Sequence, residues 1–130
     1  MNSDTQSIAI NCEFGKLYNF ISEPGNIPEW MPQFCSSVER NGDGWVAQTA
    51  AGKVKLFCKT NREYGIIDYE FKPVLPIKFI LHSRVLSNSR ACVFVMTHFK
   101  LPFTSDEIFE KQKNKVTEQL GMLKNFMEKD

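Results

Sequence analysis

The order of its structural elements constrains the fold of this chain more than any single motif. The pattern predicts a first strand followed by two short helices, and then a long middle region of successive strands. Residues 104–127 are predicted to form one long amphipathic helix. One helix about 10–12 Å across cannot cover six or seven strands that lie about 4.8 Å apart. We therefore expect the sheet to curl around the helix, and any unfilled volume between them to form an apolar cavity.

The C-terminal helix has a marked start and one apolar face. Thr104-Ser105-Asp106-Glu107 predicts a capping box, in which the Thr104 hydroxyl and the Glu107 carboxylate satisfy first-turn amides. The residues at inward positions are Phe109, Gln112, Val116, Leu120, Leu123 and Met127. Gln112 is the polar member of this stripe. Its amide needs hydrogen-bond partners from the sheet or from a ligand, unless it lies in wet first turns.

The remaining pattern predicts an antiparallel meander. A first strand is expected at Ser7–Glu13, followed by short helices at 14–21 and 26–32. Asn41-Gly42-Asp43-Gly44 is a strong hairpin signal. The later strands are expected at Ser36–Arg40, Trp45–Ala50, Lys53–Lys59, Ile66–Phe71, Ile77–Leu86 and Ala91–Phe99. The predicted class is α+β, a curved antiparallel sheet of six to seven strands wrapped around a long C-terminal helix, with two short helices after the first strand.

Composition narrows the function. The 130 residues are 42% hydrophobic, which fits a single domain over residues 1–130. A net charge of +1, spread along the chain, argues against a nucleic-acid partner. The polar N-terminus and the absence of a long apolar run argue against stable membrane insertion, and we expect a cytoplasmic protein.

The four cysteines are scattered and have no metal-ligand spacing. They are Cys12, Cys35, Cys58 and Cys92. We expect reduced thiols that act as small buried apolar side chains, and neither a metal nor another cofactor.

Several loose motifs resemble a known family. They are Ile27-Pro28-Glu29-Trp30-Met31-Pro32-Gln33-Phe34, Gly65-Ile66-Ile67-Asp68, Arg84-Val85-x-x-Asn88 and the closing Leu120-x-x-Leu123-Lys124. In this order they resemble the START-related helix-grip superfamily (SRPBCC), in its polyketide cyclase/dehydrase and lipid-transport group. The resemblance implies a cavity between sheet and helix that takes lipids, sterols, polyketides or other hydrophobic small molecules. Only some members catalyse reactions there, and no universal catalytic set can be transferred.

Two histidines are candidates for chemistry. His98 shares a strand face with Phe94 and Met96, so it faces inward if they do. An imidazole in a cavity can serve as a general base or hold a carbonyl or hydroxyl group, since its reference pKa is about 6.5. The alternative is a structural histidine at the rim of the sheet. Periodicity alone does not decide between His82 and His98, because a register slip inverts a strand.

Asp68 and Arg84 are opposite charges that interrupt two apolar strand patterns. Pointing into the cavity, they would need one another and would anchor a ligand carboxylate or enolate. Pointing outward, they would form a solvent-side ion pair between strands. His98, Asp68 and Arg84 are thus the weak catalytic candidates.

The expected ligand-binding side chains are mostly apolar, and core packing explains them equally well. They are Trp30, Phe79, Phe94, Met96, Gln112, Val116 and Leu120. Trp30, between two prolines, is interpreted either as a pocket lid or as a core plug.

Three functions remain open at this stage. The first is binding or transport of a hydrophobic small molecule by a monomer or homodimer. The second is a polyketide cyclase or dehydratase that uses polar groups of the same cavity. The third is a protein-interaction subunit with a filled core. The sequence does not decide whether the protein is an enzyme.

Overall fold

A computed structural model describes residues 2–50, 52–72 and 79–129 of the chain. Its strands are β1 (Ser3–Ile10), β2 (Cys35–Asn41), β3 (Gly44–Thr49), β4 (Gly52–Asn61), β5 (Ile66–Lys72), β6 (Phe79–Asn88) and β7 (Ala91–Phe99). The helices are α1 (Phe14–Ile21), the 3-10 turn η1 (Pro24–Asn26), α2 (Ile27–Trp30) and α3 (Asp106–Met127). All neighbouring strands are antiparallel, in the order β1-β7-β6-β5-β4-β3-β2.

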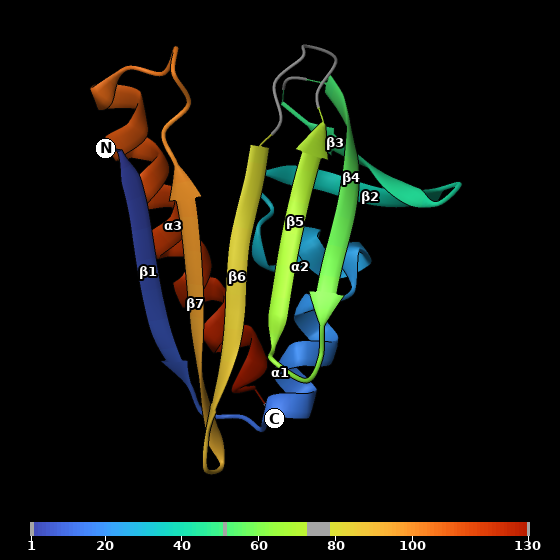
Figure 1. Ribbon diagram of the computed structural model, residues 1–130, viewed down its shortest axis with the longest axis vertical. Coiled ribbons are helices and arrows are strands. Elements are labelled where there is room, and N and C mark those ends of the chain that lie inside the picture. Colours follow the sequence, from blue (N-terminus) through green and yellow to red (C-terminus); the bar gives the residue numbers. More distant parts are fainter. Residues whose placement is uncertain (1, 51, 73–78, 130) are drawn as a thin grey trace.

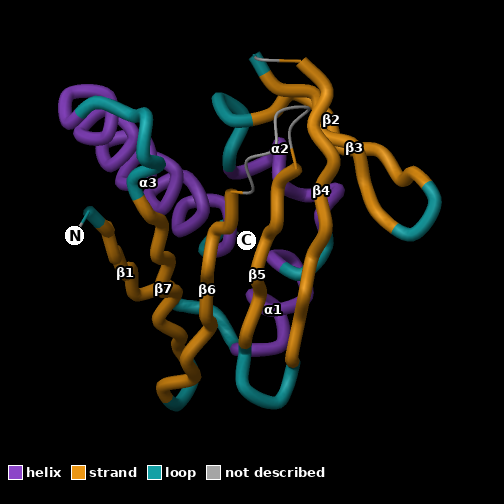
Figure 2. The backbone as a smooth tube through the Cα atoms, turned by 45° about the horizontal axis from the view of Figure 1, so that its top comes forward, coloured by secondary structure: helices purple, strands orange, loops and turns teal. Residues whose placement is uncertain are grey.

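The sheet curves around its helices (Figure 1). The long helix α3 lies behind β1 and β7, whereas α1 and α2 lie behind the other half of the sheet (Figures 1 and 2). The predicted α+β class is confirmed, with its single long C-terminal helix and its two short helices after β1. The two groups of helices divide the concave face because one helix is too narrow to cover it.

The first strand begins earlier than predicted. The expected range, Ser7–Glu13, is wrong because pairing with β7 already starts at Ser3, opposite Phe99. The strand ends at Ile10, where the Cys12 amide donates to the Ile10 carbonyl in a tight turn at 2.9 Å. Polar residues at the start of β1 therefore belong to the sheet.

The cap of α3 is shifted by one residue. Ser105, and not Thr104, is the N-cap, and its hydroxyl accepts from the Ile108 amide at 3.2 Å. The predicted capping box is wrong because the Thr104 amide is used in a turn to the Leu101 carbonyl. Asp106 then opens the helix with a hydrogen bond from Lys100, which lowers the pKa of the Asp106 carboxyl.

The cysteines are unpaired, as expected. Cys12, Cys35 and Cys92 are buried, Cys58 is partly buried, and none forms a disulfide. Burial raises the pKa of the Cys35 thiol to about 11. Burial, with the nearby Asp68 charge, raises that of Cys58 to about 12. These thiols stay protonated near neutral pH, so they pack as apolar groups.

One predicted feature lies partly outside the described residues, the start of the strand expected at Ile77–Leu86. The described part of that strand, β6, begins at Phe79.

A glycine inside α3 gives the first prediction. Gly121 has helical backbone, and a Cβ built there meets nothing within 4 Å. We expect Gly121→Ala to raise the free energy of unfolding by about 1 kcal/mol, because alanine loses less backbone entropy in a helix. Urea unfolding followed by circular dichroism measures the change. An unchanged or lower midpoint would contradict this account of the site.

Candidate functional site

A cavity of about 380 Å³ lies between the concave side of the sheet and the middle of α3. Its apolar wall consists of Met31, Phe34, Ala50, Val54, Phe71, Phe79, Leu81, Met96 and Val116. Its polar wall consists of Gln33, Thr49, His98, Gln112, Lys115 and Gln119. Strands β3 to β7, the segment after α2 and α3 all contribute, so the cavity depends on the whole curved fold.

Two of the polar side chains in the wall are almost completely buried. His98 is 2% exposed and Gln119 is 8% exposed. The Gln119 amide makes no hydrogen bond to another described residue, although an amide has two donor hydrogens and an acceptor oxygen. Its amide nitrogen and oxygen are not enclosed, because among the described residues Nε1 of Trp30 is the buried side-chain nitrogen or oxygen without a partner, so the Gln119 amide stays open to water or to a ligand. The cavity wall therefore holds unused hydrogen-bonding capacity.

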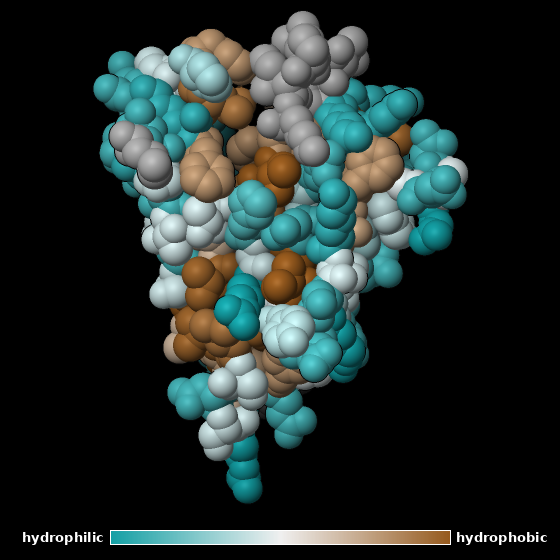
Figure 3. All heavy atoms as spheres, viewed as in Figure 1, coloured by the Kyte–Doolittle hydropathy of each residue, from teal (hydrophilic) through white to brown (hydrophobic). Residues whose placement is uncertain are grey.

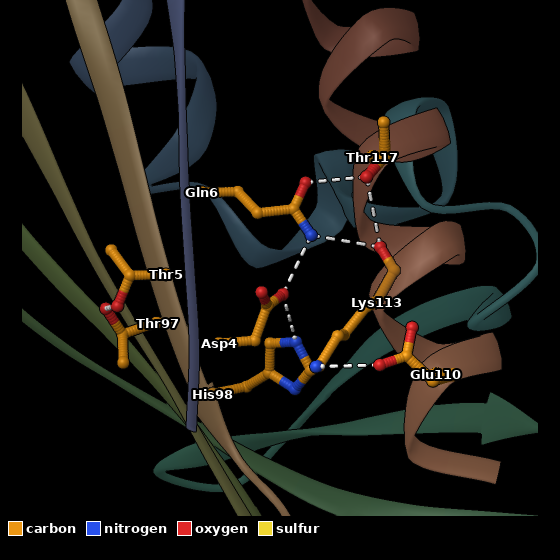
Figure 4. Close-up of polar contacts among 8 residues, drawn as sticks. All are labelled: Asp4, Thr5, Gln6, Thr97, His98, Glu110, Lys113 and Thr117. Atoms are coloured by element: carbon orange, nitrogen blue, oxygen red, sulfur yellow. Dashed lines mark hydrogen bonds and ion pairs between the residues drawn. The ribbon is translucent and has the colours of Figure 1, made fainter. Parts of the chain in front are cut away.

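The His98 ring is held by a carboxylate from the edge strand β1. Its Nε2 lies 3.0 Å from Oδ2 of Asp4 (Figure 4). The Phe109 ring of α3 packs edge-on against the imidazole, with centroids 5.3 Å apart. Asp4 is directly opposite His98 in the β1–β7 register, so the pairing follows from the strand alignment.

Hydrogen bonds from Gln6, which is itself held by α3, fix the Asp4 carboxylate (Figure 4). Gln6 donates from Nε2 to Asp4 Oδ2 at 2.7 Å, and also contacts the Lys113 carbonyl at 2.9 Å. The Thr117 hydroxyl donates to Gln6 Oε1 at 2.7 Å. These bonds tie β1 to α3 and restrain the rotamer of Asp4, and through it the plane of the His98 ring.

The hydrogen bonds also determine which His98 nitrogen carries the proton. An ionised carboxylate only accepts, so Asp4 requires a hydrogen on Nε2. In the neutral imidazole, Nδ1 is then an acceptor. Nδ1 makes no hydrogen bond to a described residue, and it points away from Asp4 in Figure 4. His98 thus offers a free lone pair in the wall of an apolar cavity.

The predicted ligand-binding residues divide into two groups. Phe79, Met96, Gln112 and Val116 line the cavity. The others pack in the core without lining it: Trp30, Phe94 and Leu120 are 0%, 0% and 3% exposed. The Trp30 and Phe94 rings meet edge to face at 5.8 Å, which fills the space next to the cavity.

Asp68 and Arg84 do not reach the cavity. Both lie on the outer face of the sheet. Asp68 follows the inward residue Ile67 and Arg84 precedes the inward residue Val85, and neighbours in a strand point to opposite faces. Figure 3 shows this face, with polar side chains among apolar ones. The expected pairing between them is also wrong, because the register sets Asp68 opposite His82.

Each of these two charged side chains contacts a different residue. Asp68 Oδ1 lies 3.3 Å from Nδ1 of His82, which is half exposed on the outer face. Arg84 donates from Nε to the Tyr64 carbonyl at 3.0 Å. Of the three catalytic candidates, only His98 belongs to the cavity.

Sequence reasoning missed three polar residues of the site, Asp4, Gln6 and Gln119. Asp4 and Gln6 share the inward face of β1 with Ile8 and Ile10, and extending that alternation backwards would have found them. Gln119 lies three residues after Val116, on the same face of α3. Its helical spacing from Val116 could have identified Gln119 as an inward residue, but the apolar Leu120 next to it was chosen for that position.

Comparison with known proteins finds solved structures with a similar fold. No family model and no curated protein matches the chain. The solved Aha1 dimer from Colwellia psychrerythraea is 14% identical, with a TM-score of 0.77 over 98% of this chain and 97% of that one. A START superfamily protein from Mycobacterium smegmatis is 10% identical, with a TM-score of 0.72 over 98% of each chain.

A third similar structure has two domains. It is the di-domain ARO/CYC protein BexL from the BE-7585A biosynthetic pathway, 14% identical, with a TM-score of 0.76. The match covers 96% of this chain but 46% of BexL. At such identities the likeness establishes the shared fold alone.

Proposed function

Because this chain has the helix-grip fold of the START-related superfamily, we propose that it binds a hydrophobic small molecule in the cavity between its sheet and α3. The observation that carries the proposal is the cavity of about 380 Å³ with a mainly apolar wall. Small-molecule sites usually occupy about 300–1,000 Å³ and combine such walls with a few placed polar groups. A cavity of this size also argues against the interaction subunit with a filled core.

The charges of the wall favour an apolar ligand. Lys115 is the one Lys, Arg, Asp or Glu among the described residues that line the cavity. It is exposed on α3, so its ammonium group can remain in water. The buried part of the wall carries His98 and Gln119 as its hydrogen-bonding groups, which suits a mostly uncharged molecule.

The first experiment asks whether the cavity binds anything. Native mass spectrometry of the purified protein would detect a retained compound. In parallel, ¹H–¹⁵N NMR spectra are recorded during titration with naphthalene. We expect saturable shifts at amides that line the cavity, including Leu81 and Met96, because a mainly apolar pocket binds apolar rings.

A matched pair of variants localises the binding. Val54→Phe adds volume inside the cavity, whereas Val93→Phe makes the same change on the opposite face of the sheet. The proposal requires Val54→Phe to weaken naphthalene binding at least tenfold and Val93→Phe to leave it unchanged. Absence of saturable shifts, or equal effects of the two variants, would overturn it.

His98 favours a second candidate function, catalysis of the cyclase or dehydratase kind. An oriented imidazole with a free nitrogen can abstract a proton next to a carbonyl, and the Asp4 carboxylate would stabilise the imidazolium formed. The test is to incubate any co-purified compound with the protein and analyse it by mass spectrometry. Conversion that His98→Phe abolishes would establish catalysis, whereas an unchanged compound would leave binding as the function.

The assembly and location of the protein are also proposals. The similar Colwellia protein is described as a dimer, which supports a homodimer beside the monomer as the states to test by sedimentation. No helix in the described part of the chain is long and apolar enough to cross a bilayer. The cytoplasm is the proposed location, and fractionation of the native host tests it.

A further inference from the structure

We propose that the ligand of this cavity carries a hydroxyl group on an aromatic ring, and that this hydroxyl donates a hydrogen bond to Nδ1 of His98. The inference rests on the proposed binding function and names the chemical class of the ligand. It starts from the Asp4–His98 pair, which presents an acceptor and not a donor to the cavity.

The first step asks whether the ligand group that meets Nδ1 must be a hydrogen-bond donor or an acceptor. With the Nε2 hydrogen directed at Asp4, the lone pair of Nδ1 needs a donor. A ketone, ether or ester oxygen has no hydrogen to give, so it would leave Nδ1 unpaired. A hydroxyl group supplies the donor, and its uncharged state suits burial better than an ammonium group would.

The second step concerns the depth of the site. His98 is 2% exposed, and the Asp4 side chain behind it is 16% exposed. Water therefore competes weakly for Nδ1 once a ligand fills the cavity. An acceptor left unpaired under these conditions costs about 1–3 kcal/mol, which is the source of discrimination between ligands.

The third step concerns the apolar part of the ligand. Phe71 in the wall contacts Phe34 and Phe79, with ring centroids 4.7 and 5.8 Å away. Met31 and Met96 add two thioethers. Rings and thioethers make favourable contacts with a further aromatic ring. At about 30 Å³ for each water-sized group, 380 Å³ holds about a dozen heavy atoms, the size of a bicyclic phenol.

A carboxylate is the main alternative to a hydroxyl. It would need a donor at His98, and so a second proton on the imidazole, or it would have to reach Lys115. Nothing buried in the described wall compensates a negative charge, since Gln119 is neutral. The cation nearest to His98 in Figure 4, Lys113, lies over the Phe109 ring, is paired with Glu110 and does not line the cavity. An anion in the cavity would therefore be desolvated without a free cation beside His98.

The test compares four probes that share the naphthalene ring at about pH 8, where an ordinary histidine is neutral. They are naphthalene, 2-naphthol, 2-methoxynaphthalene and 2-naphthoate. We expect 2-naphthol to bind at least about tenfold more tightly than 2-methoxynaphthalene, which has the oxygen but no hydrogen to donate. Equal affinities, or tighter binding of 2-naphthoate, would overturn the inference. Binding of naphthalene without any preference would leave the proposed function intact and remove only the hydroxyl assignment.

Substitution and spectroscopy assign the effect to His98. In His98→Phe the ratio of 2-naphthol to 2-methoxynaphthalene affinities should fall to about one. If that variant does not fold, long-range ¹H–¹⁵N spectra of the unaltered protein give the same information. We expect 2-naphthol to shift the Nδ1 resonance of His98 and to leave His82, on the outer face, unchanged. A preference that survives in His98→Phe, or an Nδ1 resonance that does not move, would contradict the proposal.

Discussion

Replacement of Gly65 by alanine is expected to destabilise the protein by about 3–5 kcal/mol. Gly65 ends the turn between β4 and β5 with φ = +68°, a region that costs a residue with a Cβ about 1–2 kcal/mol. A Cβ there would also overlap the carbonyl oxygen of Val85. That carbonyl cannot withdraw freely, because the Val85 amide donates to the Gly65 carbonyl at 2.8 Å and holds β6 against the turn.

Gly42 provides the control for this prediction. It has nearly the same φ, +63°, in the β2–β3 hairpin, but a Cβ there meets nothing within 4 Å. Gly42→Ala should therefore cost about 1–2 kcal/mol, the conformational part alone. Urea unfolding of both variants gives the difference, which measures the overlap with Val85. Equal losses in the two variants would show that the backbone of β6 moves to admit the methyl group.

Gly65 also shows what the sequence could predict. It opens the Gly65-Ile66-Ile67-Asp68 motif on which the resemblance to the helix-grip superfamily was based, and the fold class was confirmed. The order of strands and helices, the hairpin at Gly42 and the inward stripe of α3 all follow from local periodicity and turn chemistry. These signals lie within single elements, so they can be read without knowing how the elements pair.

The site was less predictable because it depends on pairing between elements. Asp68 and Arg84 are each anomalous within an apolar strand, yet both lie on the outer face, and the register pairs Asp68 with His82 and not with Arg84. Asp4 looks like part of a polar tail until β1 is aligned with β7, which places it opposite His98. Register is a property of two strands, and one strand's alternation does not determine it.

The second large effect is expected at Trp30. Its side chain is 0% exposed and packs edge to face on Phe94 at the centre of the core. Trp30→Ala should lower the free energy of unfolding by about 3–5 kcal/mol, because the neighbouring rings cannot close the space that the indole leaves. The partly buried Trp45 on β3 is the matched control. Its replacement by alanine should cost clearly less, as its ring is covered on one side by Arg40.

A third variant separates the packing of Trp30 from its polarity. Among the described residues, Nε1 of Trp30 is the buried side-chain nitrogen or oxygen without a hydrogen-bond partner. Trp30→Phe removes this unpaired N–H together with part of the ring, so the two effects on stability oppose each other and the net loss should be under about 2 kcal/mol. A loss as large as that of Trp30→Ala would mean that the N–H is satisfied, for instance by a buried water.

The same variants distinguish the two interpretations of Trp30. A lid would control access to the cavity, whereas a plug supports the wall from behind. Trp30 does not line the cavity, but the next residue, Met31, does. We therefore expect Trp30→Phe to bind naphthalene with nearly unchanged affinity while losing stability. A large change in the rate of naphthalene binding, with stability preserved, would instead identify Trp30 as part of the entrance.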